Sequence, residues 1–453
     1  MQTKSDAQYQ RMLTAPIPRL VMSLALPTIL STMITVIYNT ADTYFVSQID
    51  KSASAAVGAV FSIMSVIQAV GFGFAMGASS LISLKLGEKD DRAAHTYGAT
   101  GFYSAMALGG LIGALGLCFL EPILGLLCSA TMKPHARSYA AFILIAAPIS
   151  CSTFVLNNVL RSQGQSRLAM WGMMSGGLIN MALDPLLIFT LDMGAGGAAL
   201  ATAISQCVSF LILLSFFLRG KSIVSIHPKY ISRRMADYSK IVLTGIPTIF
   251  RQGLGSVAAA VLNIQAVAYG GGSDALASAA TIANKIYMLL RNLLIGLGQG
   301  FQPVAGYNYG AKNRKRAWKA FGFATTVGSA FCLVATAAII ALRRELMDFM
   351  SNDPQVIALG SEMLLYLGAV IPVLAFSTFV NQLAQCLGFK LAATVLASCR
   401  QGIFFLPAIY ALPALFGSSG VLASQAVADG LTFAVSVPFL IWFYRKHMQE
   451  EPL

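Results

Sequence analysis

Charged side chains are scarce in this chain of 453 residues, since Asp, Glu, Lys and Arg together make up only 11%. A soluble domain carries roughly a quarter charged residues. Hydrophobic residues reach 56%, and the mean hydropathy is +0.70. Apolar runs of about 20 residues, enough to cross roughly 30 Å of hydrocarbon, recur along the whole chain. This composition excludes a soluble protein and predicts an all-α polytopic membrane protein.

Sequence signatures of catalysis and of ATP hydrolysis are also missing. The chain has no GxxxxGK[ST] phosphate loop, and its four histidines are expected in polar connections, which argues against haem, zinc or histidine-relay chemistry. Its seven cysteines show no CxxC or paired spacing, so no disulfide framework is expected. We therefore expect no cofactor, and any transport by this chain has to be driven by an ion gradient.

Twelve membrane spans are predicted, with loops that place both termini on one side. They lie at about 20–47, 54–86, 97–127, 138–160, 168–190, 195–218, 241–268, 274–308, 320–342, 357–386, 391–415 and 420–443. Most Lys and Arg residues fall in the connections on the side of the termini. Only Lys51, Lys133, Arg137, Arg343 and Arg344 fall in the opposite connections. The positive-inside rule then predicts cytoplasmic termini, and it explains the net charge of +13 without nucleic acid.

The two halves of the sequence repeat each other at a spacing of about 220 residues. Pro27-Thr28-Ile29 matches Pro247-Thr248-Ile249, and Ser152 to Val155 matches Ser377 to Val380. Further matches join Gly73, Gly77 and Gly87 to Gly296, Gly300 and Gly310. Such a repeat predicts an N-lobe over 1–218, a cytoplasmic linker over 219–240 and a C-lobe over 241–453. Six spans in each lobe imply a pseudo-twofold axis along the membrane normal and alternating access between the lobes.

Several stretches resemble the multidrug and toxic compound extrusion (MATE) family. They are Tyr38-Asn39-Thr40-Ala41-Asp42-Thr43, Asn180 to Pro185, Gly194 to Gln206 and Gly298 to Ala311. The N-half aspartates look closest to the bacterial branch of DinF-like members and staphylococcal-type multidrug pumps. The resemblance implies two six-helix lobes in the cell membrane. It also implies export of organic, often cationic, compounds in exchange for protons or sodium.

Two carboxylates, Asp42 and Asp184, lie well inside the N-half spans without a basic residue beside them. A charge in hydrocarbon costs about 3 kcal/mol or more, so such a carboxylate has to pair, bind a cation or take up a proton. Tyr38 and Asp42 are spaced i, i+4, as are Asn180 and Asp184, so each pair shares a helix face. Pro185 should loosen the local helix and free carbonyl oxygens for a cation. A structural hydrogen bond at this proline, or a solvated Asp42, remains the alternative.

In the family resemblance, these four residues and Thr202 surround an N-lobe ion site. We therefore predict cation coupling at Tyr38, Asp42, Asn180, Asp184 and Thr202, with Na⁺ at the two aspartates as one possible ion. Family branches that couple ions in the C-lobe keep acidic residues in spans seven and ten. This chain has Arg251 and Gln252 in span seven instead, and amides in span ten.

The C-half spans hold basic residues at Arg251, Lys285, Arg291 and Arg400, against acids at Glu362 and Asp429. One interpretation is internal ion pairing that locks the lobe. The other is a substrate cavity whose wall is formed by Arg251, Gln252, Asn284, Asn381, Gln385 and Asp429. A wall rich in positive charge suits a cationic drug poorly unless the acids neutralise it. Anionic or zwitterionic substrates therefore remain an alternative to cationic ones.

These features together predict a monomeric secondary transporter rather than an enzyme. Its partners would be small-molecule substrates and the lipid bilayer, with no nucleic acid. Its hinges would be Pro27, Pro185 and Pro247, where a missing backbone N–H weakens a helix. A flippase for a lipid-linked precursor is the nearest alternative, although it usually needs further spans. A membrane-embedded enzyme is disfavoured because no nucleophile–base pair or metal set occurs.

Overall fold

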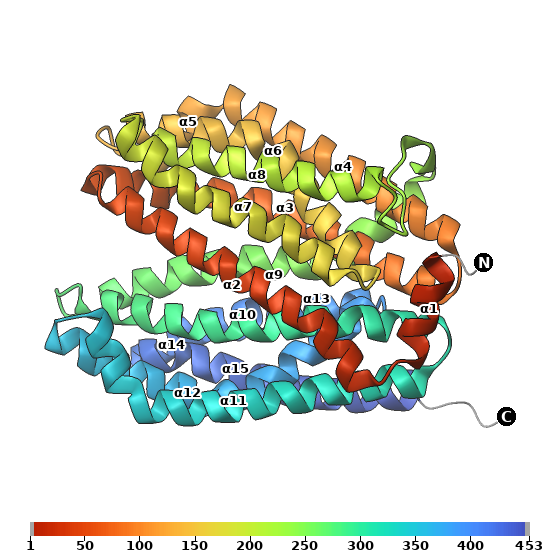
Figure 1. Cartoon of the computed structure of the whole chain (residues 1–453). Helices are drawn as coiled ribbons and strands as arrows, with labels where there is room; N and C mark the ends of the chain where they lie inside the picture. The colour runs from red at the N-terminus through yellow and green to blue at the C-terminus, as the bar shows by residue number, and fades with distance from the viewer. Residues whose placement is uncertain (1–3, 449–453) are drawn as a thin grey trace.

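The computed structural model describes residues 4–448, and every regular element in that range is helical. Figure 1 shows long, nearly parallel helices, with α1 and the last turns of the chain at one end. In chain order the elements are α1 Lys4–Thr14, α2 Ile17–Ser47, α3 Lys51–Gly87, α4 Asp91–Cys118, α5 Leu120–Leu127, α6 Lys133–Ser162, α7 Ser166–Pro185, η1 Leu186–Thr190, α8 Gly194–Leu218, η2 Pro228–Tyr230, α9 Met235–Ala268, α10 Ala275–Gly310, α11 Arg314–Met350, α12 Pro354–Cys386, α13 Lys390–Ser398, η3 Cys399–Ile403, α14 Phe405–Phe416, α15 Ser418–Phe443 and η4 Tyr444–Met448.

Ten of these helical segments are long and apolar enough to cross a membrane by length and composition. Helices α9 and α10 have 34 and 36 residues and run alongside the others, although neither contains an apolar stretch that meets this criterion. Outward-facing side chains such as Leu211, Ile264 and Val334 are exposed, which fits a lipid-covered surface rather than water. The predicted all-α membrane fold with twelve spans is confirmed.

Three predicted spans are interrupted, and only the interruption after Pro185 was expected. The span over 97–127 is divided at Phe119, where α4 ends and the short α5 begins. The span over 168–190 ends in the π-helical turn η1 after Pro185, and the span over 391–415 contains a second π-helical turn, η3. Such π turns leave backbone groups without ordinary helical partners and are frequent at functional sites.

The expected linker over 219–240 is partly helical, because α9 already begins at Met235. Its first residues are fastened to the end of α6. Gln163 accepts hydrogen bonds from the backbone N–H groups of Ile223 and Val224 at 2.7 and 3.2 Å. Farther along, the N–H of Ser232 donates to Thr100 Oγ1 at 2.9 Å. The connection between the halves is thus held against the first half of the chain.

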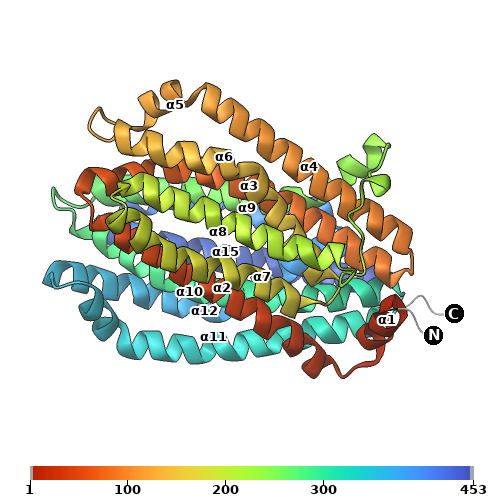
Figure 2. The same ribbon diagram turned by 45° about the horizontal axis from the view of Figure 1, so that its top comes forward.

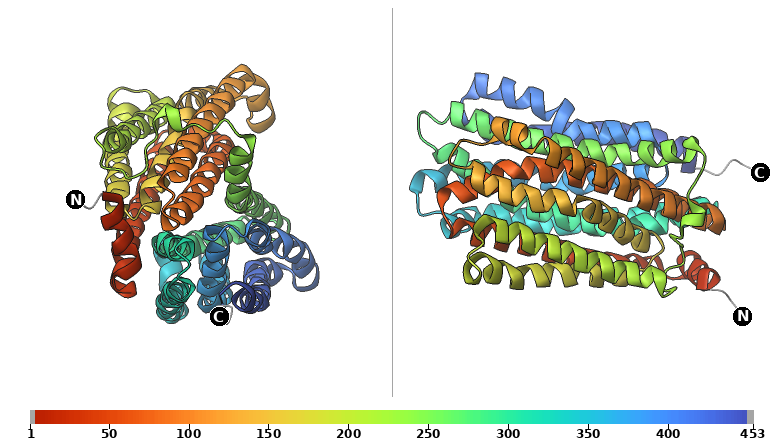
Figure 3. Two further views of the ribbon diagram at one scale, coloured as in Figure 1. Left: turned by 90° about the vertical axis from the view of Figure 1, so that its right-hand side faces the viewer. Right: turned by 90° about the horizontal axis from the view of Figure 1, so that it is seen from above.

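The first and second halves of the chain form two bundles that meet along α2, α3, α9 and α10. Figure 3 shows this division from the end where the termini lie, with α2 to α8 on one side and α9 to α15 on the other. Between the bundles, α3 packs on α9, and its counterpart α10 packs on α2. Within the bundles, α3 packs on α6 in the first, and α10 packs on α12 in the second. Figure 2 shows the same division from another angle, with α2, α7 and α8 in front.

Paired hydrogen bonds repeat between the two bundles. The Asn157 amide donates to the Ala169 carbonyl at 2.9 Å, and the Asn381 amide donates to the Ala393 carbonyl at 2.8 Å. Both bonds span 12 residues and join a long helix to the next one. Corresponding helices of the two bundles are therefore joined by the same kind of bond, one residue out of the register in which Ser152 to Val155 matches Ser377 to Val380.

The repeated glycines bring the bundles into close contact at the end that holds the termini. A Cβ on Gly77 would overlap the Ile241 carbonyl, and a Cβ on Gly245 would overlap the Gly73 carbonyl. On the other pair of helices, Gly300 lies directly against Ala25. Only glycine allows two helix backbones to approach this closely. These glycines therefore serve helix packing.

We expect Gly245→Ala to separate α9 from α3 at this end, because its methyl group has no room beside Gly73. Cys386 lines a small pocket beneath this contact and is 1% exposed. Its rate of labelling by a maleimide should therefore rise about tenfold or more, in a background where the other cysteines are replaced. Gly253→Ala on the same helix, where a Cβ meets open space, is the matched control. Equal labelling rates in the two variants would contradict this close-packing role.

Candidate functional site

An uncharged amide and a buried carboxylate meet in the N-half, between α7 and α8. The Asn180 side-chain nitrogen donates to Asp184 Oδ1 at 3.2 Å and lies 3.4 Å from Thr202 Oγ1. Asn180 is 1% exposed and Asp184 is fully buried. The i, i+4 spacing on α7 places the first two on one face, and α8 supplies the threonine. Three of the five predicted coupling residues are thus in direct contact.

The other two predicted residues come from α2 and lie next to this group. Asp42 interacts electrostatically with Asp184 and with Tyr38, and the aromatic ring of Tyr38 packs against Gly177 of α7. Tyr139 of α6, which the sequence did not single out, lies within electrostatic range of Tyr38, Asp42 and Asp184, and its hydroxyl is 3.8 Å from the sulfur of Met64. Its position near the start of a span gave no sign that it faces the acids. We call Tyr38, Asp42, Tyr139, Asn180, Asp184 and Thr202 the N-half cluster.

Three oxygens of the N-half cluster are buried without a hydrogen-bond partner. They are Asp42 Oδ1, Asn180 Oδ1 and Asp184 Oδ2. A buried oxygen with no donor costs about 1–3 kcal/mol, and more when it is charged. No basic side chain forms an ion pair with either aspartate in the described part of the chain. A proton or a small cation would satisfy these oxygens.

The turn after Asp184 adds backbone oxygens to the same region. Pro185 has no N–H, so the Met181 carbonyl receives no helical bond from it. The chain then continues as the π-helical turn η1, in which the N–H of Leu191 donates to the Leu186 carbonyl at 3.0 Å. The two carboxylates and the amide oxygen of the N-half cluster are the hard oxygen donors that a cation such as Na⁺ takes. Residues 4–448 contain no group of three or more His, Cys, Asp or Glu suited to a transition metal.

An open cavity lies in the C-half, between α9, α10 and the segment around η3, with α3 closing one side. Its empty volume, mouth included, is about 930 Å³. Of the residues predicted for a substrate cavity, Arg251, Gln252 and Asn284 line it. Its wall also contains Tyr287, Arg291, Arg400, Gln401 and Gln425. We call this space the C-half cavity.

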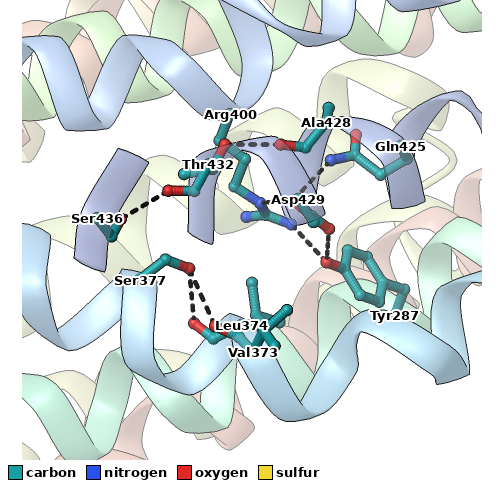
Figure 4. A network of polar contacts seen from close by, with 10 residues as sticks. All are labelled: Tyr287, Val373, Leu374, Ser377, Arg400, Gln425, Ala428, Asp429, Thr432 and Ser436. Atoms are coloured by element: carbon teal, nitrogen blue, oxygen red, sulfur yellow. Dashed lines mark hydrogen bonds and ion pairs between the residues drawn. The ribbon is translucent and has the colours of Figure 1, made fainter. Parts of the chain in front are cut away.

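Asp429 lies behind the wall of the C-half cavity and neutralises one of its arginines. Figure 4 shows the carboxylate between Arg400, Tyr287 and Gln425. Arg400 Nε donates to Asp429 Oδ1 at 2.6 Å, and Gln425 donates to the same oxygen at 3.1 Å. The Tyr287 hydroxyl donates to the other carboxylate oxygen and accepts from Arg400 Nη2 at 2.9 Å. Every oxygen of this carboxylate is therefore satisfied inside the protein.

The predicted residues Asn381 and Gln385 lie away from the C-half cavity. Asn381 bonds to the Ala393 carbonyl, as described above, and Gln385 donates to Thr248 Oγ1 at 2.7 Å. Two charges expected inside the lobe are also elsewhere. Lys285 is exposed on the surface of α10, and Glu362 accepts hydrogen bonds from Tyr366 and Ser419 at 2.8 and 3.0 Å. Ion pairing in the lobe thus involves Arg400 and Asp429 rather than all six charged residues.

The hinge candidates Pro27, Pro185 and Pro247 all lie within or at the end of a helix. Pro27 and Pro247 are buried at equivalent places in α2 and α9. Arg161, which the sequence analysis did not select, lies near the close contact of the bundles. It donates to Gln299 of α10 and, at 3.1 Å, to Ser31 of α2. This arginine thereby ties the two halves together at the end that holds the termini.

Comparison with known proteins finds similar proteins over nearly the whole chain. The sequence model of the MatE family matches residues 27–186 and 247–411. The multidrug export protein MepA of Staphylococcus haemolyticus is 27% identical over 429 residues, which cover 94% of each chain. MepA of Staphylococcus aureus is 25% identical over 445 residues, 98% of this chain and 97% of that protein.

Solved structures share the fold over nearly the full length. A MATE protein in complex with MaL6 has a TM-score of 0.90 at 23% identity, covering 97% of this chain and 98% of that one. A transporter of the MOP superfamily from Pyrococcus furiosus has a TM-score of 0.91 at 23% identity, covering 99% and 100%. For that transporter, the reverse polarity of the binding pocket was taken to suggest a different function.

Proposed function

The chain belongs to the MatE family, and we propose that it exports small organic compounds by antiport with protons or sodium ions. The observation that carries this proposal is the set of unpartnered buried oxygens on Asp42, Asn180 and Asp184. Such a set binds a proton or a cation reversibly, which is what an ion-coupled transporter requires. The multidrug export names of its relatives support the same activity.

Coupling would operate through the two packed bundles. A proton or cation between Asp42 and Asp184 would relieve their repulsion and let α2 bend near Pro27. Bending of α2 would loosen its contact with α10 at Gly300. The bundles would then separate at the end that holds the termini and close at the other. Export would follow if that end faces the cytoplasm, as the Lys and Arg distribution predicts.

The direct test is transport by purified protein in liposomes. Efflux of at least one of two dyes, the cation rhodamine 6G or the anion fluorescein, should follow an imposed proton or sodium gradient and stop when an ionophore dissipates it. Gradients of the two ions, applied one at a time, identify the coupling ion. Transport that persists without any ion gradient would reject antiport.

Ion and substrate should also compete at equilibrium. Measured in detergent, substrate affinity should fall about tenfold as pH drops or as sodium rises, because the ion stabilises the other conformation. The same factor must describe how substrate weakens ion binding, since the coupling is reciprocal. Asp42→Asn should flatten this dependence, whereas Asp274→Asn, on an exposed loop residue, should leave it intact. Affinity that responds to neither ion would contradict coupling in the N-half cluster and favour the flippase alternative.

A further inference from the structure

The C-half cavity carries an excess of positive charge. Among the described residues that line it, three are arginines and none is Asp or Glu. Asp429 compensates Arg400 from behind the wall, at 2.6 Å. Arg251 and Arg291 form no ion pair in the described part of the chain. The cavity wall thus holds two guanidinium groups without a counterion.

Arg291 is held in place while part of its guanidinium stays unsatisfied. The Gln401 side-chain amide lies between the two arginines. Its oxygen accepts a hydrogen bond from Arg291 Nη1 at 3.2 Å, and its nitrogen donates to the backbone carbonyl of Arg251 at 3.1 Å. Arg291 Nε is buried and has no partner. An unpaired buried charge is costly to a fold, by several kcal/mol when a partner is removed. A ligand that brings the missing negative charge would offset that cost whenever it binds.

We propose that the C-half cavity binds organic anions, through a carboxylate, sulfonate or phosphate group placed between Arg251 and Arg291. This inference rests on the proposed export function and names its substrate class. Guanidinium groups present a planar set of donors that matches these anionic groups. The side chains of Gln252 and Asn284, on the same wall, can hydrogen-bond to the rest of the substrate.

The remaining walls fit an amphipathic compound rather than an inorganic ion. Phe61 of α3, Met288 of α10 and Phe405 of α14 line the C-half cavity beside the arginines. A flat aromatic body would pack against these side chains while its anionic group meets the guanidiniums.

The two halves of the protein then have opposite polarity. The N-half cluster has two carboxylates and attracts the coupling cation, whereas the C-half cavity has two uncompensated arginines and attracts the substrate anion. A cationic drug would be repelled from the C-half cavity by Arg251 and Arg291. Ion and substrate would therefore bind at separate places and compete only through the shared change in conformation.

A matched pair of dyes tests this inference. Fluorescein, a dianion at pH 8, and rhodamine 6G, a cation, share the same three-ring core. Purified full-length protein in detergent should bind fluorescein more tightly than rhodamine 6G in a fluorescence anisotropy titration. Arg251→Gln and Arg291→Gln should each weaken fluorescein binding about tenfold or more, the usual effect of losing a charge-assisted hydrogen bond. Arg251→Lys, which keeps the charge, should retain part of the affinity.

Lys285→Gln is the matched control, because it removes the same charge from α10 at an exposed position. Fluorescein binding that is equal in wild type, Arg251→Gln and Arg291→Gln would overturn the inference. Gradient-driven efflux of rhodamine 6G in that case would leave the proposed export standing. Arginine-dependent fluorescein binding without any gradient-driven efflux would support the anion site and reject antiport.

A free organic anion and an anionic lipid headgroup share this chemistry, and competition distinguishes the two sources. Phthalate, a soluble dicarboxylate, should displace fluorescein from wild-type protein and from Lys285→Gln. Phosphatidate added to the micelles should displace it only weakly if the substrate is a free compound. Stronger displacement by phosphatidate, lost in Arg291→Gln, would assign the same site to a lipid headgroup. Displacement by neither competitor would contradict an anion site.

Discussion

Replacing Asp184 by Asn is expected to abolish gradient-driven efflux while leaving the protein folded in the membrane. The carboxylate is fully buried, and its Oδ2 has no hydrogen-bond partner. An Asn side chain keeps the shape and the contact with Asn180 but can neither take up a proton nor balance a cation. Transport in proteoliposomes should fall by at least about a hundredfold, as expected when an embedded coupling charge is removed.

Asp192→Asn is the control for this experiment. Asp192 lies eight residues further along and is exposed at a left-handed backbone position that Asn also tolerates. The Asp192→Asn protein should be expressed and purified like the wild type, and its efflux activity should be unchanged. Size-exclusion profiles and thermal unfolding establish that the Asp184 variant is folded. Full efflux by a folded Asp184→Asn protein would disprove coupling at this residue.

The fold was largely predictable because hydrocarbon imposes one strong requirement on the chain. A span needs about 20 apolar residues with internally paired backbone groups, so the number and length of spans follow from hydropathy. The break at Phe119 was not predictable, since it lies within a continuously apolar run, and Arg400 and Gln401 in η3 marked a polar position but not a π-helical turn. Helix α1 escaped notice because its sequence is polar.

The N-half cluster was predictable for a related reason. A carboxylate within an apolar span is costly, so Asp42 and Asp184 stand out, and helical spacing adds Tyr38 and Asn180. Tyr139 gave no such signal, because an aromatic residue near the end of a span is ordinary. Its approach to the acids depends on how α6 packs against α2 and α7, which one-dimensional patterns do not encode.

The C-half was harder to predict because its polar residues divide between two roles. Asn381 and Arg251 are both polar positions in apolar helices, yet Asn381 joins two helices and Arg251 faces the cavity. The sequence repeat did not reveal this, because its register pairs Asn157 with Gln382, whereas the structure shows Asn157 and Asn381 making the same kind of bond. Side chains that lack a counterpart in the other half, such as Arg291, are better candidates for substrate binding.

The ion pair between Arg400 and Asp429 is expected to contribute strongly to the stability of the C-half. Both side chains are largely buried, with 16% and 1% of their side-chain surface exposed. Removing one partner from a buried pair leaves an uncompensated charge and costs roughly 3–5 kcal/mol. Asp429→Asn and Arg400→Gln should therefore each lower the free energy of unfolding by about that amount.

The double variant decides whether this loss comes from the pair. If it does, combining Asp429→Asn with Arg400→Gln should cost several kcal/mol less than the sum of the single losses, because no unpaired charge remains. The exposed pair of Arg137 and Glu121, at 3.2 Å, is the control, and neutralising it should change stability by about 1 kcal/mol or less. Chemical denaturation in mixed micelles measures all the variants under one condition. Additive losses at Arg400 and Asp429 would show that each side chain acts on its own, for example through Tyr287 or Gln425, and not as an ion pair.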